Sequence, residues 1–148
     1  MSRGLKAKEL FLNGYNCCQA VVLAFCDEVN LDKETALLIA SSFGGGIGRL
    51  REVCGAVSGM FIVLGFLEGY DNSDDSEKKK ELYASVQRLA KEFEEENGSY
   101  VCRELLGLSV KSESPEPQKR CDEYYKKRPC AELCEMAAKI LENYIENK

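Results

Sequence analysis

The sequence predicts an all-α fold, a bundle of about six to seven helices around one central glycine-rich helix. Apolar residues recur with the helical period along nearly the whole chain, and no stretch alternates apolar and polar residues as a strand would. Residues that cap or stop helices separate the periodic segments. With 148 residues, 45% hydrophobic and 30% charged, the chain has the size and composition of a single domain over residues 1–148.

Each of the first three predicted helices has a capping residue at one of its ends. They span residues 5–13, 17–29 and 32–43. Gly14 lies where a left-handed residue would end the first helix. Asn16 and Asp32 lie where a side-chain oxygen would accept a backbone N–H at the start of the second and third helices.

The middle of the chain is rich in glycine. Residues 44–48 contain four glycines, which allow positive φ angles or close contact with another segment. The next predicted helix, residues 53–70, carries Gly55, Gly59 and Gly65 among large apolar residues. A glycine inside a helix costs about 0.8–1 kcal/mol relative to alanine. These glycines therefore indicate a central helix that its neighbours approach closely, or a site beside it.

Three further helices are predicted in the last half of the chain. They span residues 76–96, 99–106 and 129–144. Gly98 stops the first of them, Ser99 caps the second, and Pro129 occupies the favoured first position of the third. Between the last two, residues 109–118 contain two prolines and several polar residues, which predicts an exposed loop.

Charge and hydropathy exclude several classes of function. The net charge of −5 lacks the basic footprint of a nucleic-acid-binding protein, so we expect no nucleic-acid partner. The longest apolar run, residues 53–67, contains three glycines and is shorter than the roughly 20 residues of a membrane-spanning helix. We therefore expect no membrane insertion. The first ten residues lack the apolar core of a secretory signal, which predicts a cytoplasmic protein.

Eight cysteines and the absence of histidine are the most informative features of the composition. Disulfides are rare in the cytoplasm, where a surplus of cysteine indicates catalysis or metal binding. Without imidazole, Cys–His and Ser–His–Asp catalysis are excluded, as is every metal site that contains histidine. A reactive thiolate in this chain must therefore be stabilised by helix termini, basic neighbours or a metal ion.

Four cysteines fall in the first turns of predicted helices. They are Cys17, Cys54, Cys102 and Cys130. A first turn carries free amide protons and about half a positive charge, so we expect these thiols to have lowered pKa values. Arg51, Arg103 and Arg128 lie within three residues of the last three of these cysteines. Electropositive surroundings of this kind favour the thiolate.

The other four cysteines have simpler interpretations. Cys26 and Cys134 continue apolar helix faces, so we expect them to be core residues. Cys121 lies in a polar segment and is expected to be an exposed thiol. Cys18 points about 100° away from Cys17 around the helix, and the sequence leaves open which of the two faces the site.

The chain resembles a known family, the putative redox-active proteins named for a cysteine followed by the motif CGAxxG and then by two further cysteines. The central motif stands here as Cys54-Gly55-Ala56-Val57-Ser58-Gly59. Further matches follow in order: Gly14-Tyr15-Asn16-Cys17, Phe43-Gly44-Gly45-Gly46, Cys102-Arg103-Glu104-Leu105-Leu106-Gly107 and Cys130. The resemblance implies that the four first-turn cysteines are the family's cysteines. One departure is Cys18, where a small residue such as alanine is expected.

The two outer glycines of the central motif have a physical role of their own. Gly55 and Gly59 lie four residues apart on one helix face, where they open a strip beside Cys54. Either a neighbouring helix or a bound cofactor group can occupy that strip. The sequence leaves both interpretations open.

The favoured function is thiol–disulfide redox chemistry, with Cys54 as the nucleophile. Cys17, Cys102 or Cys130 would resolve the mixed disulfide, which requires Cα atoms about 4.4–6.8 Å apart. The expected partner is a redox protein or a small thiol or disulfide. The sequence does not decide whether the chain is an enzyme, such as a thiol–disulfide oxidoreductase, and it leaves the oligomeric state open.

Two alternatives remain beside redox exchange. The same four residues, Cys17, Cys54, Cys102 and Cys130, could ligate zinc or an iron–sulfur cluster. Their gaps of 37, 48 and 28 residues would require four separate elements to converge. The second alternative is a non-catalytic helical partner module with inert thiols.

Overall fold

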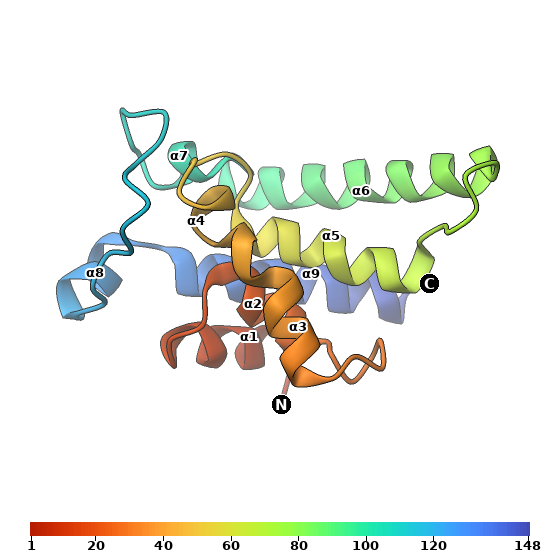
Figure 1. Cartoon of the computed structure of the whole chain (residues 1–148), viewed down its shortest axis with the longest axis horizontal. Coiled ribbons are helices and arrows are strands. Elements are labelled where there is room, and N and C mark those ends of the chain that lie inside the picture. The colour runs from red at the N-terminus through yellow and green to blue at the C-terminus, as the bar shows by residue number, and fades with distance from the viewer.

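The computed structural model describes residues 1–148 and contains nine α-helical segments, one short 3₁₀ turn and no β-strand. The segments are α1 (Arg3–Leu12), α2 (Cys17–Ala24), α3 (Lys33–Ala40), η1 (Ser41–Phe43), α4 (Gly44–Ile47), α5 (Gly55–Glu68), α6 (Ser76–Asn97), α7 (Cys102–Leu105), α8 (Asp122–Lys127) and α9 (Cys130–Glu146). The α4, α7 and α8 segments are single short turns, while the other six are helices of at least eight residues. The all-α prediction is confirmed (Figure 1).

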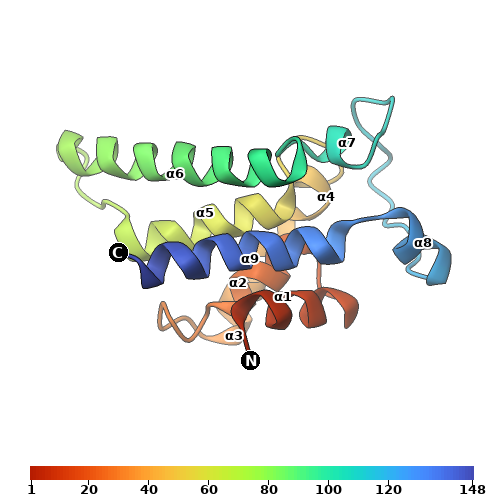
Figure 2. The same cartoon turned by 180° about the vertical axis from the view of Figure 1, so that it is seen from behind.

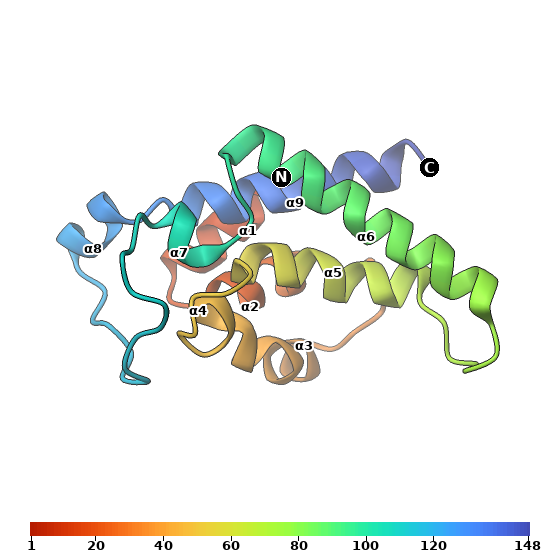
Figure 3. The same ribbon diagram turned by 90° about the horizontal axis from the view of Figure 1, so that it is seen from above.

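The glycine-rich helix α5 lies at the centre of the bundle. It packs against α2, α6 and α9, while α1 packs against α9 and α2. Figure 2 shows α6, α9 and α1 stacked at the back of the molecule, and Figure 3 shows α5 between α9 and α2. The short segments α4, α7 and α8 gather at one end of the bundle in all three views.

A single cluster of 27 buried residues forms the hydrophobic core. Its largest fully buried side chains include Phe11 from α1, Met60 and Leu64 from α5, Phe93 from α6 and Leu141 from α9. Complete burial of such a side chain contributes about 1.5–3 kcal/mol. The core thus ties the long helices together. None of the helices has both the length and the apolar character needed to span a bilayer.

Several predicted boundaries need correction. The second helix ends at Ala24 rather than near Val29, because residues 25–30 form turns and Asn30 adopts a φ of 59°. The short helix α8 was not expected, since its six charged and aromatic residues follow a long polar loop. Pro129 precedes α9 as its N-cap instead of occupying its first turn.

The glycines of α5 differ sharply in their surroundings. A Cβ atom at Gly59 would lie 2.9 Å from the Cβ of Val21 and 3.0 Å from the carbonyl oxygen of Cys18, both in α2. A Cβ at Gly65 would meet nothing within 4 Å. Close packing therefore explains Gly59, while nothing in the structure explains Gly65.

Alanine substitutions at these two glycines are predicted to have opposite effects on stability. Gly59→Ala should lower the free energy of unfolding by about 1–3 kcal/mol, because its methyl group would overpack the contact with α2. Gly65→Ala should raise it by about 0.5–1 kcal/mol, because alanine is the better helix former at an open position. Urea unfolding measures both changes, and equal effects of the two variants would contradict the packing described here.

Candidate functional site

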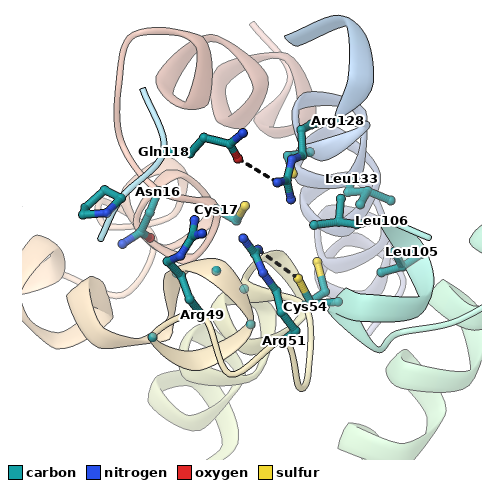
Figure 4. Close-up of a pocket in the computed structure, with 18 of the residues that line it drawn as sticks. Asn16, Cys17, Arg49, Arg51, Cys54, Leu105, Leu106, Gln118, Arg128 and Leu133 are labelled. Atoms are coloured by element: carbon teal, nitrogen blue, oxygen red, sulfur yellow. Dashed lines mark hydrogen bonds between the residues drawn. The ribbon is translucent and has the colours of Figure 1, made fainter. Parts of the chain in front are cut away.

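A pocket of about 380 Å³ lies at the end of the bundle where α2, α5, α7 and α9 begin (Figure 4). Of the eight cysteines in the chain, four line this pocket. They are Cys17, Cys54, Cys102 and Cys130. The structure therefore brings together the four cysteines that the sequence singled out, each carried by a different helix start.

All four cysteines lie at or beside the start of a helix, and a capping interaction fixes one of these starts. Asn16 and Gln19 form a capping box at the start of α2, so that Cys17 is the first residue of that helix. Cys54 is the N-cap of α5, because this helix begins at Gly55 rather than at residue 53 as predicted. Cys102 and Cys130 are the first residues of α7 and α9.

An isolated antiparallel bridge joins the segments that carry Cys54 and Cys102. Val53 pairs with Val101, and the amide of Cys54 donates to the carbonyl of Tyr100 at 2.8 Å. In an extended segment, the residue that follows a bridged residue points to the face opposite to that of the bridged side chain. The bridge therefore directs the two cysteine side chains to the same side, toward the pocket.

A second group of thiols lies around Cys17. Its thiol is within hydrogen-bonding reach of those of Cys130 and Cys134, and the Cys134 thiol also faces the Cys17 carbonyl oxygen at 3.8 Å. Cys134 is thus a core residue, as expected, that also touches the site. Cys18 is fully buried in the core, so Cys17 is the member of the adjacent pair that lines the pocket. Cys121 is exposed, as expected.

Arginine is the other residue type that characterises the pocket. Four arginines line it, and no lining residue is a carboxylate; the arginines are Arg49, Arg51, Arg120 and Arg128. Glu113, just outside the lining, forms ion pairs with Arg49 at 3.7 Å and with Arg51 at 2.6 Å. In a protein with a net charge of −5, this pocket is locally electropositive.

The buried guanidinium group of Arg51 contacts a thiol directly. Its Nη1 donates to the Sγ of Cys102 at 3.5 Å, the interaction drawn as a dashed line in Figure 4. Arg51 is only three residues from Cys54 in sequence, yet the thiol it contacts is 51 residues away. Arg103 instead donates to Glu52 at 3.0 Å.

The loop that carries Arg49 and Arg51 has a left-handed backbone. Residues 45–49 all have φ angles between 58° and 69°, and Arg51 has a φ of 58°. This conformation costs about 1–2 kcal/mol for each residue that is not glycine, which here includes Ile47. A Cβ at Gly46 would lie 2.6 Å from the Cβ of Cys102, so the glycines both relieve strain and allow the loop to cover that cysteine.

Burial overrides the expected lowering of the thiol pKa values, and that expectation was wrong. Burial raises the pKa of Cys54 to about 12, although two backbone N–H groups in the first turn of α5 oppose the shift. Burial also raises the pKa of Cys102, but here Arg51 opposes it. Helix starts do supply favourable donors, and the loss of water at the thiols outweighs them.

The pKa values of Cys17 and Cys130 are governed by their mutual contact. The hydrogen bond with Cys17 raises the pKa of Cys130 far above its usual range, and burial adds to the shift. For Cys17, the contact with Cys130 lowers the pKa, while the contact with Cys134 and burial raise it to a net value well above the usual range. This pair therefore remains protonated at neutral pH.

The strip beside the central motif is filled by protein. A Cβ at Gly55 would lie 3.1 Å from the Cβ of Cys17, and Gly59 faces Val21 at similarly short range. Of the two interpretations of these glycines, the close helix contact describes the observed packing. Gly55 still forms part of the pocket wall, while Gly59 does not.

The arrangement of donors gives no metal-binding group. No three or more of the Cys, Asp and Glu side chains lie close enough to one another to hold a metal ion. Among the pocket thiols, that of Cys17 interacts with that of Cys130, while Cys54 and Cys102 follow the two residues of the antiparallel bridge. The geometry is therefore that of neighbouring thiols around an open space.

Comparison with known families gives one informative match. Residues 15–144 match the family model described as "Putative redox-active protein (C_GCAxxG_C_C)". No curated protein and no solved structure matches the chain significantly. The name of this family contains the pattern GCAxxG, in which the central cysteine follows a glycine. In this chain the order is reversed, because Cys54 precedes Gly55. The matched range contains all four pocket cysteines.

Removal of the Arg51 guanidinium group is predicted to reduce the reactivity of Cys102. In Arg51→Met, the pKa of Cys102 should rise because the charge that opposes burial is lost. A rise of one pH unit reduces the thiolate fraction at neutral pH about tenfold. Alkylation of Cys102 by neutral iodoacetamide, followed by peptide mass spectrometry across a pH series, measures this change.

Two further variants isolate the cause of that change. Arg88→Gln removes an arginine that stacks on Tyr144 away from the pocket, and it should leave the alkylation profile of Cys102 intact. Glu113→Gln removes the carboxylate that Arg51 also contacts, and it should not slow the reaction. A wild-type profile in Arg51→Met would contradict the assigned role of the guanidinium group.

Proposed function

Because the chain belongs to the C_GCAxxG_C_C family of putative redox-active proteins, we propose that its pocket cysteines carry out reversible thiol–disulfide exchange. The observation that carries this proposal is the convergence of four thiols, from four separate helix starts, on one pocket. Exchange requires a thiolate, a resolving thiol nearby and access for an oxidised partner. The pocket supplies several thiols, an opening and, at Cys102, a guanidinium group that favours the thiolate.

The attacking thiol in this proposal is Cys102. It is the pocket thiol that accepts a hydrogen bond from a guanidinium group, and that group favours the thiolate. The sequence pattern nominated Cys54 for this role, but burial with a pKa of about 12 makes it a poor thiolate at neutral pH. It lines the same pocket, on a segment bridged to that of Cys102, and we assign it the resolving role.

The electrons and protons of the exchange balance in two steps. The Cys102 thiolate attacks one sulfur of the partner disulfide, forming a mixed disulfide and releasing one thiolate, which takes up a proton. Cys54 then loses its proton and attacks the Cys102 sulfur, which releases the second partner thiolate. The chain gains one disulfide and loses two electrons, and the partner disulfide becomes two thiols.

The pair Cys17 and Cys130 supplies a second reversible disulfide. Their thiols lie close enough for each to shift the pKa of the other, and both line the pocket. Because both are protonated at neutral pH, we expect them to react second: exchange with the Cys54–Cys102 disulfide oxidises them and reduces that pair, which a second partner disulfide then oxidises again. The pocket would then store four electrons in its fully reduced state. Eight thiols in one chain suit a reducing compartment such as the cytoplasm, where we place this chemistry.

A zinc or iron–sulfur site is the competing use of the same sulfurs. Four thiolates around one space are a suitable donor set in chemical terms. The present spacing of the side chains does not group three of them around a single point, and we therefore derive no chemistry through a metal. Metal analysis of anaerobically purified protein distinguishes the two functions, because stoichiometric metal that is lost in Cys54→Ser would support ligation.

Oxidation of the reduced protein is predicted to remove thiols in pairs. We would use a Cys121→Ser background, because this exposed thiol reacts on its own. Limiting amounts of a small disulfide should lower the number of titratable thiols by two and then by four, and a dithiol reductant should restore them. The alternative of a helical module with inert thiols predicts no change in either direction.

The order of attack has its own test. In Cys54→Ser, the mixed disulfide at Cys102 cannot be resolved, so mass spectrometry should find one partner moiety attached to that residue. In Cys102→Ser, the first step should slow markedly and no such adduct should form at Cys54. A stable adduct at Cys54 in that variant would reverse the two assignments while leaving thiol exchange in place.

A further inference from the structure

The pocket has an excess of positive charge that the redox chemistry itself does not require. Four guanidinium groups line it, and one carboxylate, that of Glu113, lies within ion-pairing distance of two of them. Arg120 is held by the backbone carbonyls of Phe11 and Tyr15 and has no carboxylate partner. Arg128 likewise has no carboxylate partner: it donates to the amide oxygen of Gln118 at 2.7 Å and lies over the ring of Tyr124.

Two of these arginines point into the open part of the pocket. In Figure 4, Arg49 and Arg128 extend from opposite walls toward the space in front of Cys17, and Arg51 lies below them. The side chain of Arg49 is 18% exposed, so it is neither free in solvent nor closed off by protein. Guanidinium groups of this kind bind carboxylates and other oxyanions through paired hydrogen bonds.

The depth of the thiols restricts the size of the partner. Cys54, Cys102 and Cys130 are each only 4–8% exposed and lie within the pocket. A disulfide on the surface of a folded protein would have to enter the pocket to reach them. A volume of about 380 Å³ lies within the range of small-molecule sites.

The wall across from Arg49, from which Arg128 extends, also carries apolar side chains. Leu105, Leu106 and Leu133 lie across from Arg49 in Figure 4. A ligand that suits both walls has a short aliphatic chain with an anionic end. The thiols then lie within reach of the middle of such a ligand, where a symmetrical disulfide carries its sulfur atoms.

From these observations we infer that the exchange partner is a small disulfide whose ends carry carboxylates or similar anionic groups, bound by Arg49 and Arg128. This inference rests on the proposed thiol exchange and names its substrate class. Cys102 attacks the central sulfur–sulfur bond, Cys54 resolves the mixed disulfide, and two anionic thiols leave. In the reverse reaction the two anionic thiols give two electrons to the Cys54–Cys102 disulfide and are joined again as the small disulfide.

A matched series of short disulfides tests the inference. Dithiodipropionate is anionic, hydroxyethyl disulfide is neutral and cystamine is cationic, and all three have similar lengths. The rate of oxidation of the reduced Cys121→Ser protein by each compound is divided by its rate with an unstructured peptide that carries one cysteine. This ratio removes differences in intrinsic reactivity between the disulfides.

We expect the normalised rate with dithiodipropionate to exceed that with hydroxyethyl disulfide by about tenfold, and that with cystamine by more. The preference should shrink as salt is added, because screening weakens attraction at the mouth of the pocket. In Arg49→Gln/Arg128→Gln, the anionic-to-neutral ratio should fall about tenfold. Arg88→Gln, outside the pocket, should keep the wild-type ratio.

The outcomes separate failure of the inference from failure of the proposed function. If none of the disulfides produces an intramolecular disulfide in the chain, thiol exchange itself is wrong. If all three react at equal normalised rates, exchange stands and selection of anions is wrong. A protein disulfide that oxidises the chain much faster than dithiodipropionate would overturn the assignment of a small partner. If the double variant does not fold, the salt dependence of the wild-type protein still tests whether positive charge selects the anionic disulfide.

Discussion

The close contact between α2 and α5 is the constraint on which the site depends. Gly55 and Gly59 have no Cβ atoms, so the backbone of α5 lies directly against Cys17 and Val21. A methyl group at either glycine would fall about 3 Å from atoms of α2. Because both helices start at the pocket, this contact also fixes the position of Cys17 relative to Cys54. The glycines of the central motif thus serve the sulfur chemistry by positioning it.

The glycines of residues 44–48 also position a cysteine by close backbone contact, in this case Cys102. The left-handed loop passes so close to Cys102 that only glycine fits at position 46, and the loop then places Arg51 against the thiol. Burial and positive charge therefore act on Cys102 in opposite directions. Burial alone would leave four unreactive thiols, whereas the buried guanidinium group favours the thiolate at one of them. The net pKa of Cys102 is still raised, so the guanidinium group increases the thiolate fraction at this sulfur without making the thiolate its main form.

The sequence contained most of the fold and the identity of the site cysteines, because both depend on local patterns. Helical periodicity and capping residues such as Asn16 act within a few residues, and the structure reproduces them. The thiol pKa values could not be predicted in this way, since they depend on how much water the fold excludes. Nothing in the local sequence marks Arg49 or Arg120, which reach the pocket only through tertiary packing. Arg51 was noted beside the wrong cysteine for the same reason.

Mapping the disulfides of the oxidised chain tests the central claim most directly. After oxidation by a small disulfide, non-reducing peptide mass spectrometry identifies which of the eight cysteines are joined. If the fold gathers one redox site, the bonds will join only Cys17, Cys54, Cys102 and Cys130 to one another, while Cys18 and Cys26 remain thiols. Random pairing that includes Cys18 and Cys26, or bonds only between separate chains, would contradict this account.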